Sequence, residues 1–264
     1  MKLVKLAAYL DEAGEDPACG CDTLRSVGIT NIALRHAWSD NICKLSDQAC
    51  KLLRLTINNN EMHTMLVASD LGLVPSNDLM KISKSDITRT FDIAKYFNST
   101  SIRIFLGTRP SISYKVDEAI IKEWMAMITE LSIYANIVPV YEIMHGSSLY
   151  KPTEIVDMFN KFKRWKILYD PAQLIIRQSV NPFVKYWTLL KSYTHIIDIH
   201  DFKIGFGHKP CGYGDSFIQN TISDSHTNFN GWYILEPSLG RKYGSALTKS
   251  DTFKMGFEAL EALD

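Results

Sequence analysis

The stretch IVPVYEIMHG, residues 137–146, is a short apolar run that ends in the acid Glu142 and leads into a polar turn. The same organisation returns at KILYD (166–170), HIIDIH (195–200) and GWYILE (231–236). Short apolar runs rich in β-branched and aromatic residues predict buried strands, and the intervals between these four are long enough for helices. The second half of the chain therefore predicts four parallel strands joined by helices.

The first half repeats the pattern. Its strand candidates are VKLAAYL (4–10), NIALRHA (31–37), HTMLVAS (63–69) and SIRIFLG (101–107). Amphipathic spacing or start signals predict helices at 17–27, 46–57, 86–97, 116–135, 152–163, 180–192, 215–223 and 249–262. Eight strands alternating with helices predict an α/β protein, a (β/α)8 barrel. Because no linker or change of composition interrupts the pattern, we expect a single domain over residues 1–264.

Composition excludes several classes of protein. Apolar residues make up 46% of the chain and charged residues 22%, which are values of a globular protein and not of a disordered one. Lys plus Arg equals Asp plus Glu at 29 each, so there is no net positive field to bind nucleic-acid phosphates. No apolar run reaches about 18 residues, and the N-terminal segment turns acidic too early for a signal peptide. We expect neither a membrane nor a nucleic acid as partner.

The number and spacing of the cysteines indicate the cellular compartment of the protein. The five cysteines are an odd number scattered through a long chain, unlike the dense even sets of secreted proteins, and we expect a cytoplasmic protein. Cys19 and Cys21 form a C-x-C pair, but no second pair or nearby histidine completes a zinc set. A place at a helix start or in the core explains both of them.

Acidic residues end the last four expected strands. In a (β/α)8 barrel such positions face the mouth where active sites lie. They are Glu142, Asp170, Asp198 and Glu236, and His200 follows two residues after Asp198, on the same face of its strand. One such acid is equally well explained as a helix cap or an ion-pair partner. Four in succession predict a metal site, because buried carboxylates are costly singly and become favourable around a cation.

The motifs also carry a family resemblance. The segments YLDEAGEDP and NIALRHAWSDNICKLSD, followed in order by YEIMHG, YDPAQL, IDIHDFK, GYGD and YILEPSLG, resemble the xylose-isomerase-like sugar phosphate isomerases and epimerases over nearly the whole chain. The resemblance implies that Glu142, Asp170 and Glu236 bind a divalent metal. The fourth ligand position falls on Asp198, and His200 is the alternative. An oxygen-only set favours Mg²⁺ or Mn²⁺, whereas His200 would move the preference toward Mn²⁺, Co²⁺ or Zn²⁺.

The resemblance further implies an activity. Members of the family interconvert sugars or sugar phosphates through an enediolate, with metal polarising the carbonyl and carboxylates moving the proton. Glu142 and Glu236 are the expected catalytic pair. The expected ligand is a small sugar or sugar phosphate, and barrels of this group commonly form homodimers. Which sugar is used, and whether it is phosphorylated, stays open.

Four further residues are candidates for substrate contact. Arg35 and His36 end the second expected strand, and Lys203 lies in the loop after the seventh, where barrels often bind phosphate. His145 matches a histidine of the family motif after the fifth strand. Each is also explained as an ion-pair partner of a rim acid or as a solvated side chain.

Departures from the motifs keep a second function open. Ala33 stands where the second-strand motif has Glu, and Leu73 where the third has Lys. Met144 and Ser238 replace a Glu and a His of later motifs. A barrel that binds a ligand or regulates without catalysis is therefore the alternative. An apurinic endonuclease of the same superfamily would need extra histidines, and the chain has Gln173 at such a position.

Overall fold

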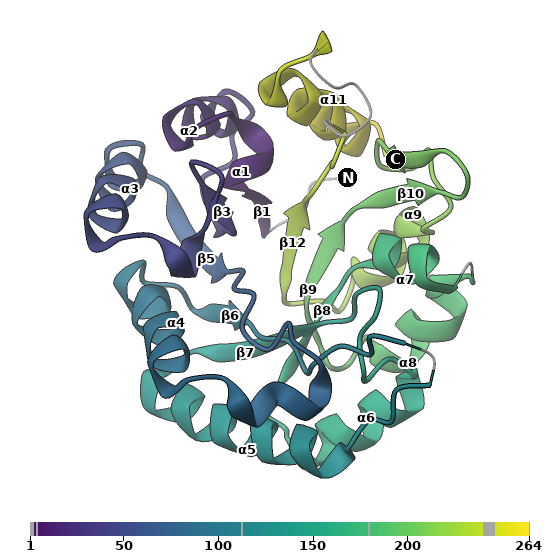
Figure 1. Ribbon diagram of the computed structural model, residues 1–264. Coiled ribbons are helices and arrows are strands. Elements are labelled where there is room, and N and C mark those ends of the chain that lie inside the picture. Colours follow the sequence, from purple (N-terminus) through teal and green to yellow (C-terminus); the bar gives the residue numbers. More distant parts are fainter. Residues whose placement is uncertain (1–2, 4, 112, 179, 240–245, 264) are drawn as a thin grey trace.

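Eight parallel strands close into a barrel in the order β1-β12-β9-β8-β7-β6-β5-β2, seen along its axis in Figure 1. The computed structural model describes residues 3, 5–111, 113–178, 180–239 and 246–263. The first and last strands pair in parallel and complete the ring, with Ala7 opposite Ile234. The chain is thus the expected (β/α)8 barrel. Its strands are β1 (Leu6–Tyr9), β2 (Asn31–Leu34), β5 (His63–Val67), β6 (Ser101–Arg103), β7 (Val138–Glu142), β8 (Lys166–Tyr169), β9 (Thr194–Ile199) and β12 (Trp232–Leu235).

Helices surround the barrel. Their starts follow local chemistry: the hydroxyl of Ser46 accepts from the amide of Ala49, and Thr248 forms a capping box with Asp251. In the described part of the chain, none of these helices has the length and apolar character needed to cross a membrane. They are α1 (Leu10–Ala13), α2 (Pro17–Ser26), α3 (Asp47–Asn59), α4 (Lys84–Tyr96), α5 (Glu118–Ala135), α6 (Pro152–Lys161), α7 (Pro171–Gln178), α8 (Thr188–Leu190), α9 (Ile218–Ser225) and α11 (Lys249–Glu261).

The structure differs from the sequence pattern at three places. The second strand ends at Leu34, because β3 (His36–Ala37) turns back to pair with β4 (Asp40–Asn41). A second hairpin, β10 (Asp201–Lys203) with β11 (Gly207–Lys209), follows β9. The helix expected at 180–192 is a π-helical turn, Phe183–Trp187, followed by the short α8, while α7 begins earlier, directly after Asp170.

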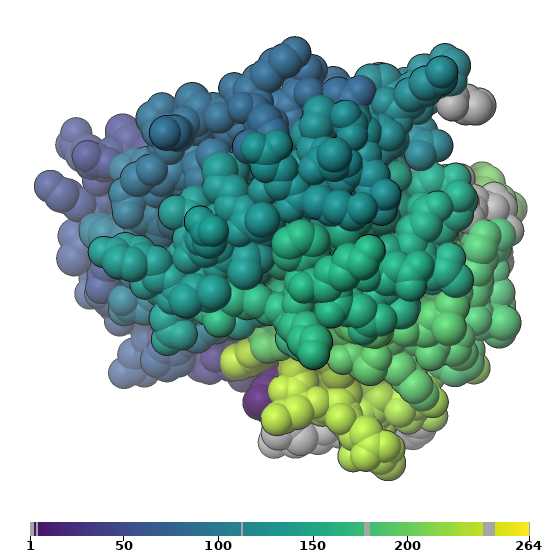
Figure 2. Space-filling model, turned by 90° about the horizontal axis from the view of Figure 1, so that it is seen from below, coloured from purple at the N-terminus to yellow at the C-terminus, as the bar shows by residue number. Residues whose placement is uncertain are grey.

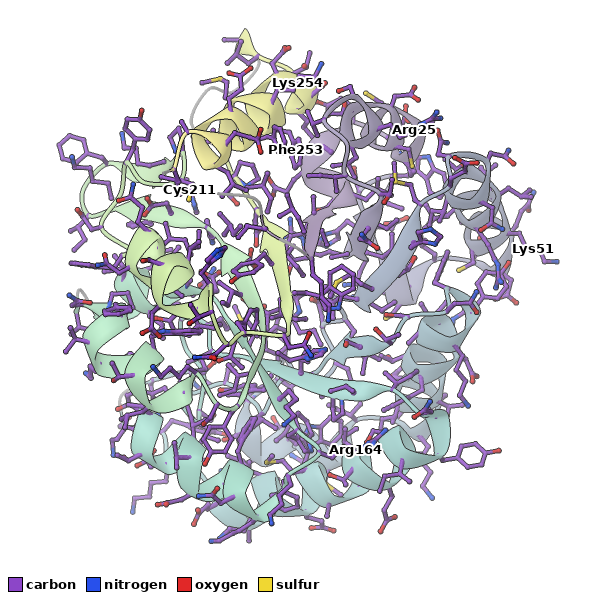
Figure 3. The ribbon with its side chains drawn as sticks, turned by 180° about the vertical axis from the view of Figure 1, so that it is seen from behind. Arg25, Lys51, Arg164, Cys211, Phe253 and Lys254 are labelled. Carbon is purple, nitrogen blue, oxygen red and sulfur yellow. The ribbon has the colours of Figure 1, made fainter. Side chains whose placement is uncertain are left out.

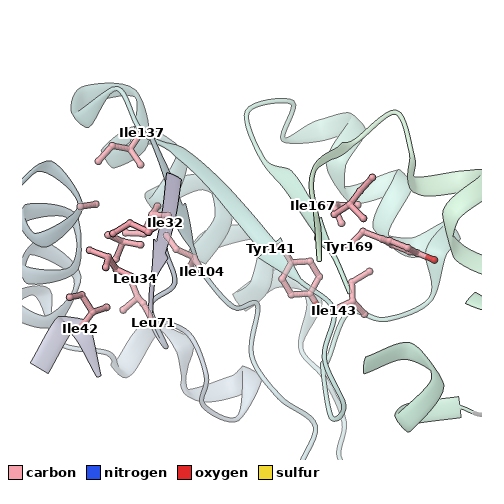
Figure 4. Close-up of a cluster of buried hydrophobic side chains, with 14 of the residues drawn as sticks. Ile32, Leu34, Ile42, Leu71, Ile104, Ile137, Tyr141, Ile143, Ile167 and Tyr169 are labelled. Atoms are coloured by element: carbon pink, nitrogen blue, oxygen red, sulfur yellow. The ribbon is translucent and has the colours of Figure 1, made fainter. Parts of the chain in front are cut away.

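The period of two along each strand decides which residues face the barrel axis. Val140, Leu168, Ile196 and Ile234 belong to the cluster inside the barrel, whereas their neighbours Ile167 and Tyr141 pack outward toward the helices (Figure 4). Residues two positions further along point inward again. The strand-end residues that this rule turns toward the axis are Arg103, Glu142, Asp170, Asp198, His200 and Glu236.

Apolar burial on the inner helix faces supports this arrangement. Phe253 of α11 is fully buried, whereas Arg25, Lys51 and Lys254 of the outer ring carry their charges away from the core (Figure 3). In Figure 2 the middle of the chain forms a closely packed side of the molecule. At the amino ends of the barrel strands, Nζ of Lys5 donates to the carbonyl of Asn230 at 2.9 Å. This hydrogen bond connects the start of β1 to the segment before β12.

Gly72 combines a left-handed backbone conformation with a neighbouring carbonyl that leaves no room for a side chain. Its φ is +86°, and a Cβ there would lie 2.1 Å from the carbonyl oxygen of Phe105. Gly146 also has a φ of +86°, but no atom would lie within 4 Å of its Cβ. Gly146→Ala should therefore cost only the backbone strain of about 1–2 kcal/mol. We expect Gly72→Ala to cost at least about 2 kcal/mol more in urea unfolding; equal costs for the two variants would contradict the close approach.

Candidate functional site

A group of acids and one histidine fills the carboxyl end of the barrel. Glu142 is the last residue of β7, Asp170 follows β8, Asp198 and His200 lie on and just after β9, and Glu236 follows β12. All five are between 1% and 8% exposed. Burial at this depth makes an uncompensated charge costly, so the partners of each group decide what the site can do. We call these five residues the acid ring.

Three members of the acid ring come together as a candidate metal centre. Asp170, His200 and Glu236 each offer one ligand atom, and these atoms all lie within 4.8 Å of one another. Asp170 is fixed at the start of α7, where its Oδ1 accepts from the amide of Gln173 at 3.1 Å. Its Oδ2 lies 3.0 Å from Nδ1 of His200. Two carboxylates and an imidazole are ligands that divalent metals use in proteins.

His200 links the acid ring to the β10–β11 hairpin. Its Nε2 lies 2.8 Å from Nδ1 of His208, and the two rings stack with centroids 4.9 Å apart. Burial disfavours the charged imidazole, but the neighbouring carboxylates, Asp170 first, raise the pKa of His200 to about 9. Without a cation the ring is therefore protonated at neutral pH and donates from both nitrogens.

Asp198 has no donor for either of its oxygens among the described residues, although both are buried. Burial, and then the charges of Glu236 and Asp170, raise the pKa of Asp198 well above its usual range. Asp198 and Glu236 are in hydrogen-bonding contact, which favours a proton on Asp198 and the ionised form of Glu236. A cation bound between the two carboxylates would take the place of that proton.

Glu236 belongs to a second charge cluster, centred on Arg35. The Arg35 guanidinium lies 2.6 Å from Oε1 of Glu236, 3.0 Å from Asp11 and 2.9 Å from Glu12, and it stands over the ring of Tyr9 at 4.4 Å. Burial alone would raise the pKa of Glu236, but Arg35 and then His200 hold it below its usual range. Three carboxylates share one guanidinium, so the cluster keeps an excess of negative charge.

Glu142 is paired differently. Nη1 of Arg103 donates to its Oε2 at 2.8 Å, and both side chains are nearly inaccessible to solvent. Burial is the larger influence and raises the pKa of Glu142, while the charge of Arg103 acts in the opposite direction. Glu142 lies outside the group of three close ligand atoms.

The expected substrate residues separate into two sets. Arg35 joins Glu236 directly, and His36 lies 3.5 Å from Asp11, so both belong to the Arg35 cluster. His145 is exposed in the loop after β7, and Lys203 is exposed on β10, 5.6 Å from the ring of Phe206. In the ranges that the structure describes, neither of these two pairs with the acid ring.

A cavity of about 250 Å³ opens beside the Arg35 cluster. Asp11, His36, Trp38 and Lys249 line it, together with residues from the start of α2. Oδ1 of Asp11 is buried without a donor among the described residues. The cavity is therefore lined by a carboxylate residue, an imidazole and an indole beside the Arg35 cluster.

Sequence reasoning did not find Arg103, Glu12 or His208. Arg103 lies inside the apolar run 101–107, where its inward direction follows from the period of two once the strand is placed. Glu12 lies in the short helix after β1, and its approach to Arg35 depends on the pairing of β1 with β2. His208 contacts His200 only because the β10–β11 hairpin forms, and the periodicity of apolar residues does not predict that hairpin.

The residues present suit a divalent cation. The donor set of Asp170, His200 and Glu236 is compact, and the buried Asp198 lies beside it in contact with Glu236. These features define a class: a (β/α)8 barrel with a carboxylate–histidine centre at the carboxyl ends of its strands. Residues 21–261 match the family model described as the xylose isomerase-like TIM barrel. The chain belongs to that family.

Solved structures share the fold at low sequence identity. A xylose isomerase domain containing protein from Salmonella typhimurium LT2 has a TM-score of 0.73 and 11% identity, covering 100% of this chain and 99% of its own. A xylose isomerase-like TIM barrel protein from Mycobacterium smegmatis, in complex with magnesium, has a TM-score of 0.70 and 16% identity, over 98% and 96%. D-allulose 3-epimerase from Methylomonas sp., in complex with D-allulose, has 0.72 and 9%, over 100% and 98%. No curated protein matches the sequence.

Proposed function

We propose that this protein is a divalent-metal-dependent isomerase or epimerase of a small sugar or sugar phosphate. The observation that carries the proposal is the close approach of Asp170, His200 and Glu236 at the barrel mouth. These three residues would hold the cation, with Asp198 beside them. A divalent cation there would polarise a substrate carbonyl and stabilise the negative charge that develops on its oxygen. Mn²⁺ and Mg²⁺ are the proposed metals, with Zn²⁺ and Co²⁺ as the alternatives that His200 allows.

The chain's own carboxylates would move the proton. One carboxylate takes the proton from the carbon next to the carbonyl, the C–H electron pair becomes a C=C bond, and the carbonyl oxygen takes the charge. Return of a proton to the former carbonyl carbon, together with transfer of the neighbouring hydroxyl's proton to the former carbonyl oxygen, gives isomerisation, and return to the opposite face of the same carbon gives epimerisation. Glu142 and Glu236 are the proposed pair, because both are buried at the mouth and each is oriented by one arginine.

The cavity beside Asp11 and His36 is the proposed place for the far end of the substrate. The polar side chains that line it, Asp11, His36 and Lys249, favour a ligand with hydroxyl groups, which every sugar supplies. In this placement Arg35 and His36 contact the substrate. His145 and Lys203 would contact it only if their loops close over a bound ligand. The five free cysteines support the cytoplasmic setting that we propose.

Hydrogen exchange tests the proposal without knowledge of the exact sugar. Chelator-treated protein is incubated in D₂O with a panel of ketoses, aldoses and their phosphates, and deuterium next to the carbonyl is followed by NMR. We expect exchange with at least one sugar when Mn²⁺ or Mg²⁺ is restored, and a loss of at least about 100-fold without metal. Exchange that does not respond to the chelator would contradict metal dependence.

A barrel that binds a ligand without catalysis is the second candidate. It is favoured by the ion pairs that engage both proposed catalytic acids, and by the low exposure of the acid ring. In this case a sugar would bind and raise the melting temperature, but no panel member would exchange its C–H protons. Metal content is a second criterion, because stoichiometric metal in the purified protein would support an enzyme over a barrel that only binds a ligand.

A further inference from the structure

The β10–β11 hairpin meets the candidate metal centre through a pair of histidines. Nε2 of His200 lies 2.8 Å from Nδ1 of His208, and the planes of the two rings differ by only 4°. On the other side of the ring, Nδ1 of His200 lies 3.0 Å from Oδ2 of Asp170. Both ring nitrogens of His200 are therefore engaged, and the ring cannot rotate without losing these contacts.

His208 is held in place by the hairpin that carries it. β10 and β11 pair so that His208 lies opposite Phe202, and the two rings pack edge to face with centroids 5.4 Å apart. The chain after the hairpin returns to β10, where the amide of Asp215 donates to the carbonyl of Phe202 at 2.8 Å. Oδ2 of Asp215 accepts from the amide of Ile204 at 2.9 Å. These contacts add to the pairing with β11 and fix the position of the hairpin.

Asp201 stabilises the same hairpin at its base. Its carboxylate is 2% exposed and accepts backbone N–H groups with both oxygens. The donors are the amides of Gly212 and Gly214 to Oδ2, at 2.9 and 2.8 Å, and those of Phe202 and Ser216 to Oδ1, at 2.9 and 3.2 Å. A Cβ on Gly214 would lie 2.1 Å from Oδ1, so this approach requires glycine. We call these hydrogen bonds the Asp201 cluster.

We propose that His208 is a positioning residue for the cation: it accepts from Nε2 of His200 and so leaves Nδ1 of His200 as the atom that binds the metal. The inference rests on the proposed function and deepens it, because it names the ligand atom and the element that orients it. A histidine that binds a metal through one ring nitrogen usually donates from the other. Nδ1 is also the nitrogen that faces Asp170, another of the proposed ligands. The Asp201 cluster contributes by fixing the hairpin.

Substitution of His208 tests this role without a substrate, with Mn²⁺ binding to the full chain measured by calorimetry. His208→Phe keeps a ring against Phe202 but offers no acceptor, and we expect Mn²⁺ to bind about 10–100-fold more weakly. In His208→Asn the side-chain oxygen replaces Nδ1 as the acceptor, so the affinity should stay within about threefold of wild type. His63→Phe is the control, because His63 is exposed at the amino end of β5 and its loss should change nothing.

Asp201→Asn tests the contribution of the Asp201 cluster. The side-chain amide presents N–H groups to backbone amides that now donate to a carboxylate, so hydrogen bonds are lost and the hairpin loosens. We expect Mn²⁺ affinity to fall by at least about tenfold and trypsin to cleave after Lys203 faster than in wild type. Asp224→Asn is the matched control, because Asp224 lies on α9 and asparagine can still accept from Nε1 of Trp187. Neither quantity should change in it.

The ligand atom can be identified directly in the wild-type protein. NMR of chain labelled with nitrogen-15 in its histidines reports which ring nitrogen binds Zn²⁺, the diamagnetic ion among the proposed metals. We expect Zn²⁺ on Nδ1 of His200, with Nε2 still protonated and His208 not coordinated. Zn²⁺ on Nε2 of His200, or on His208 itself, would overturn the inference. Equal losses of Mn²⁺ affinity in His208→Phe and His208→Asn would also contradict it, because a general disturbance of the hairpin would then explain both.

Failure of the inference and failure of the proposed function are distinguishable. If wild type binds Mn²⁺ and exchanges sugar protons, but His208→Phe binds Mn²⁺ equally well, the inference fails and the proposed function stands. If the metal binds as expected and no sugar exchanges, the positioning role stands and the catalytic function fails. A wild-type chain that binds none of Mn²⁺, Mg²⁺ and Zn²⁺ overturns both. Should Asp201→Asn not fold, the two His208 variants and the NMR of wild type decide the question.

Discussion

Glu236→Gln is expected to lower turnover by about 10²–10⁴-fold, the loss typical of removing a general acid or base. Glutamine keeps the shape of the side chain and can still accept from Arg35, so the barrel should fold. It lacks the charge that the proposed cation and the proposed proton transfer both need. Mn²⁺ affinity should fall as well, because Glu236 is one of the three close ligand positions.

A matched change on the surface provides the control. Glu118 pairs with Lys122 one helical turn away, at 3.2 Å, and both side chains are well exposed. Glu118→Gln removes the same charge from the same type of side chain, and surface pairs of this kind contribute less than about 1 kcal/mol. Turnover and Mn²⁺ affinity should not change. Wild-type turnover in Glu236→Gln would remove Glu236 from the reaction.

Periodicity explains why the barrel could be predicted from the sequence. Each of the eight apolar runs overlaps an observed barrel strand, because alternation of buried residues is a property of the strand itself. The two hairpins were not anticipated. In the first, Trp38 and Ser39 adopt positive φ angles of 50° and 70°, which residue type alone would not suggest. That turn is why the second strand ends at Leu34.

The site was predictable only in the part that depends on single strands. Glu142, Asp170, Asp198 and Glu236 follow apolar runs at inward positions, so their place at the mouth follows from the strand period. The positions of their arginine partners do not follow from the strand period. Arg103 is 39 residues from Glu142, and Arg35 is 201 residues from Glu236. Arg103 meets Glu142 only once β6 and β7 pair, and Arg35 meets Glu236 only once β1 and β12 close the ring. These contacts decide which acid carries free charge.

Arg35→Met is expected to destabilise the fold by about 3–5 kcal/mol at neutral pH, the cost of breaking a buried ion pair by removing one partner. The substitution keeps an unbranched side chain of similar length but leaves Asp11, Glu12 and Glu236 without their common cation. Urea unfolding of the metal-free protein measures the effect. Lys122→Met is the control, because Lys122 pairs at 3.2 Å with the exposed Glu118 on the surface of α5 and should lose less than about 1 kcal/mol.

The pH dependence of this loss follows from the pKa shifts. In the wild-type protein Arg35 helps to hold the pKa values of Asp11 and Glu236 below their usual range against the effect of burial. That stabilisation is present above the unfolded-state pKa of about 4 and is lost as pH falls through the lowered folded-state values. Without Arg35 burial dominates and raises these pKa values, so the variant gains stability on acidification as its carboxyl groups take up protons. The difference between variant and wild type should therefore shrink from pH 7.5 toward about pH 5. A constant difference across this range would mean that packing of the arginine side chain, and not its charge, holds the barrel mouth together.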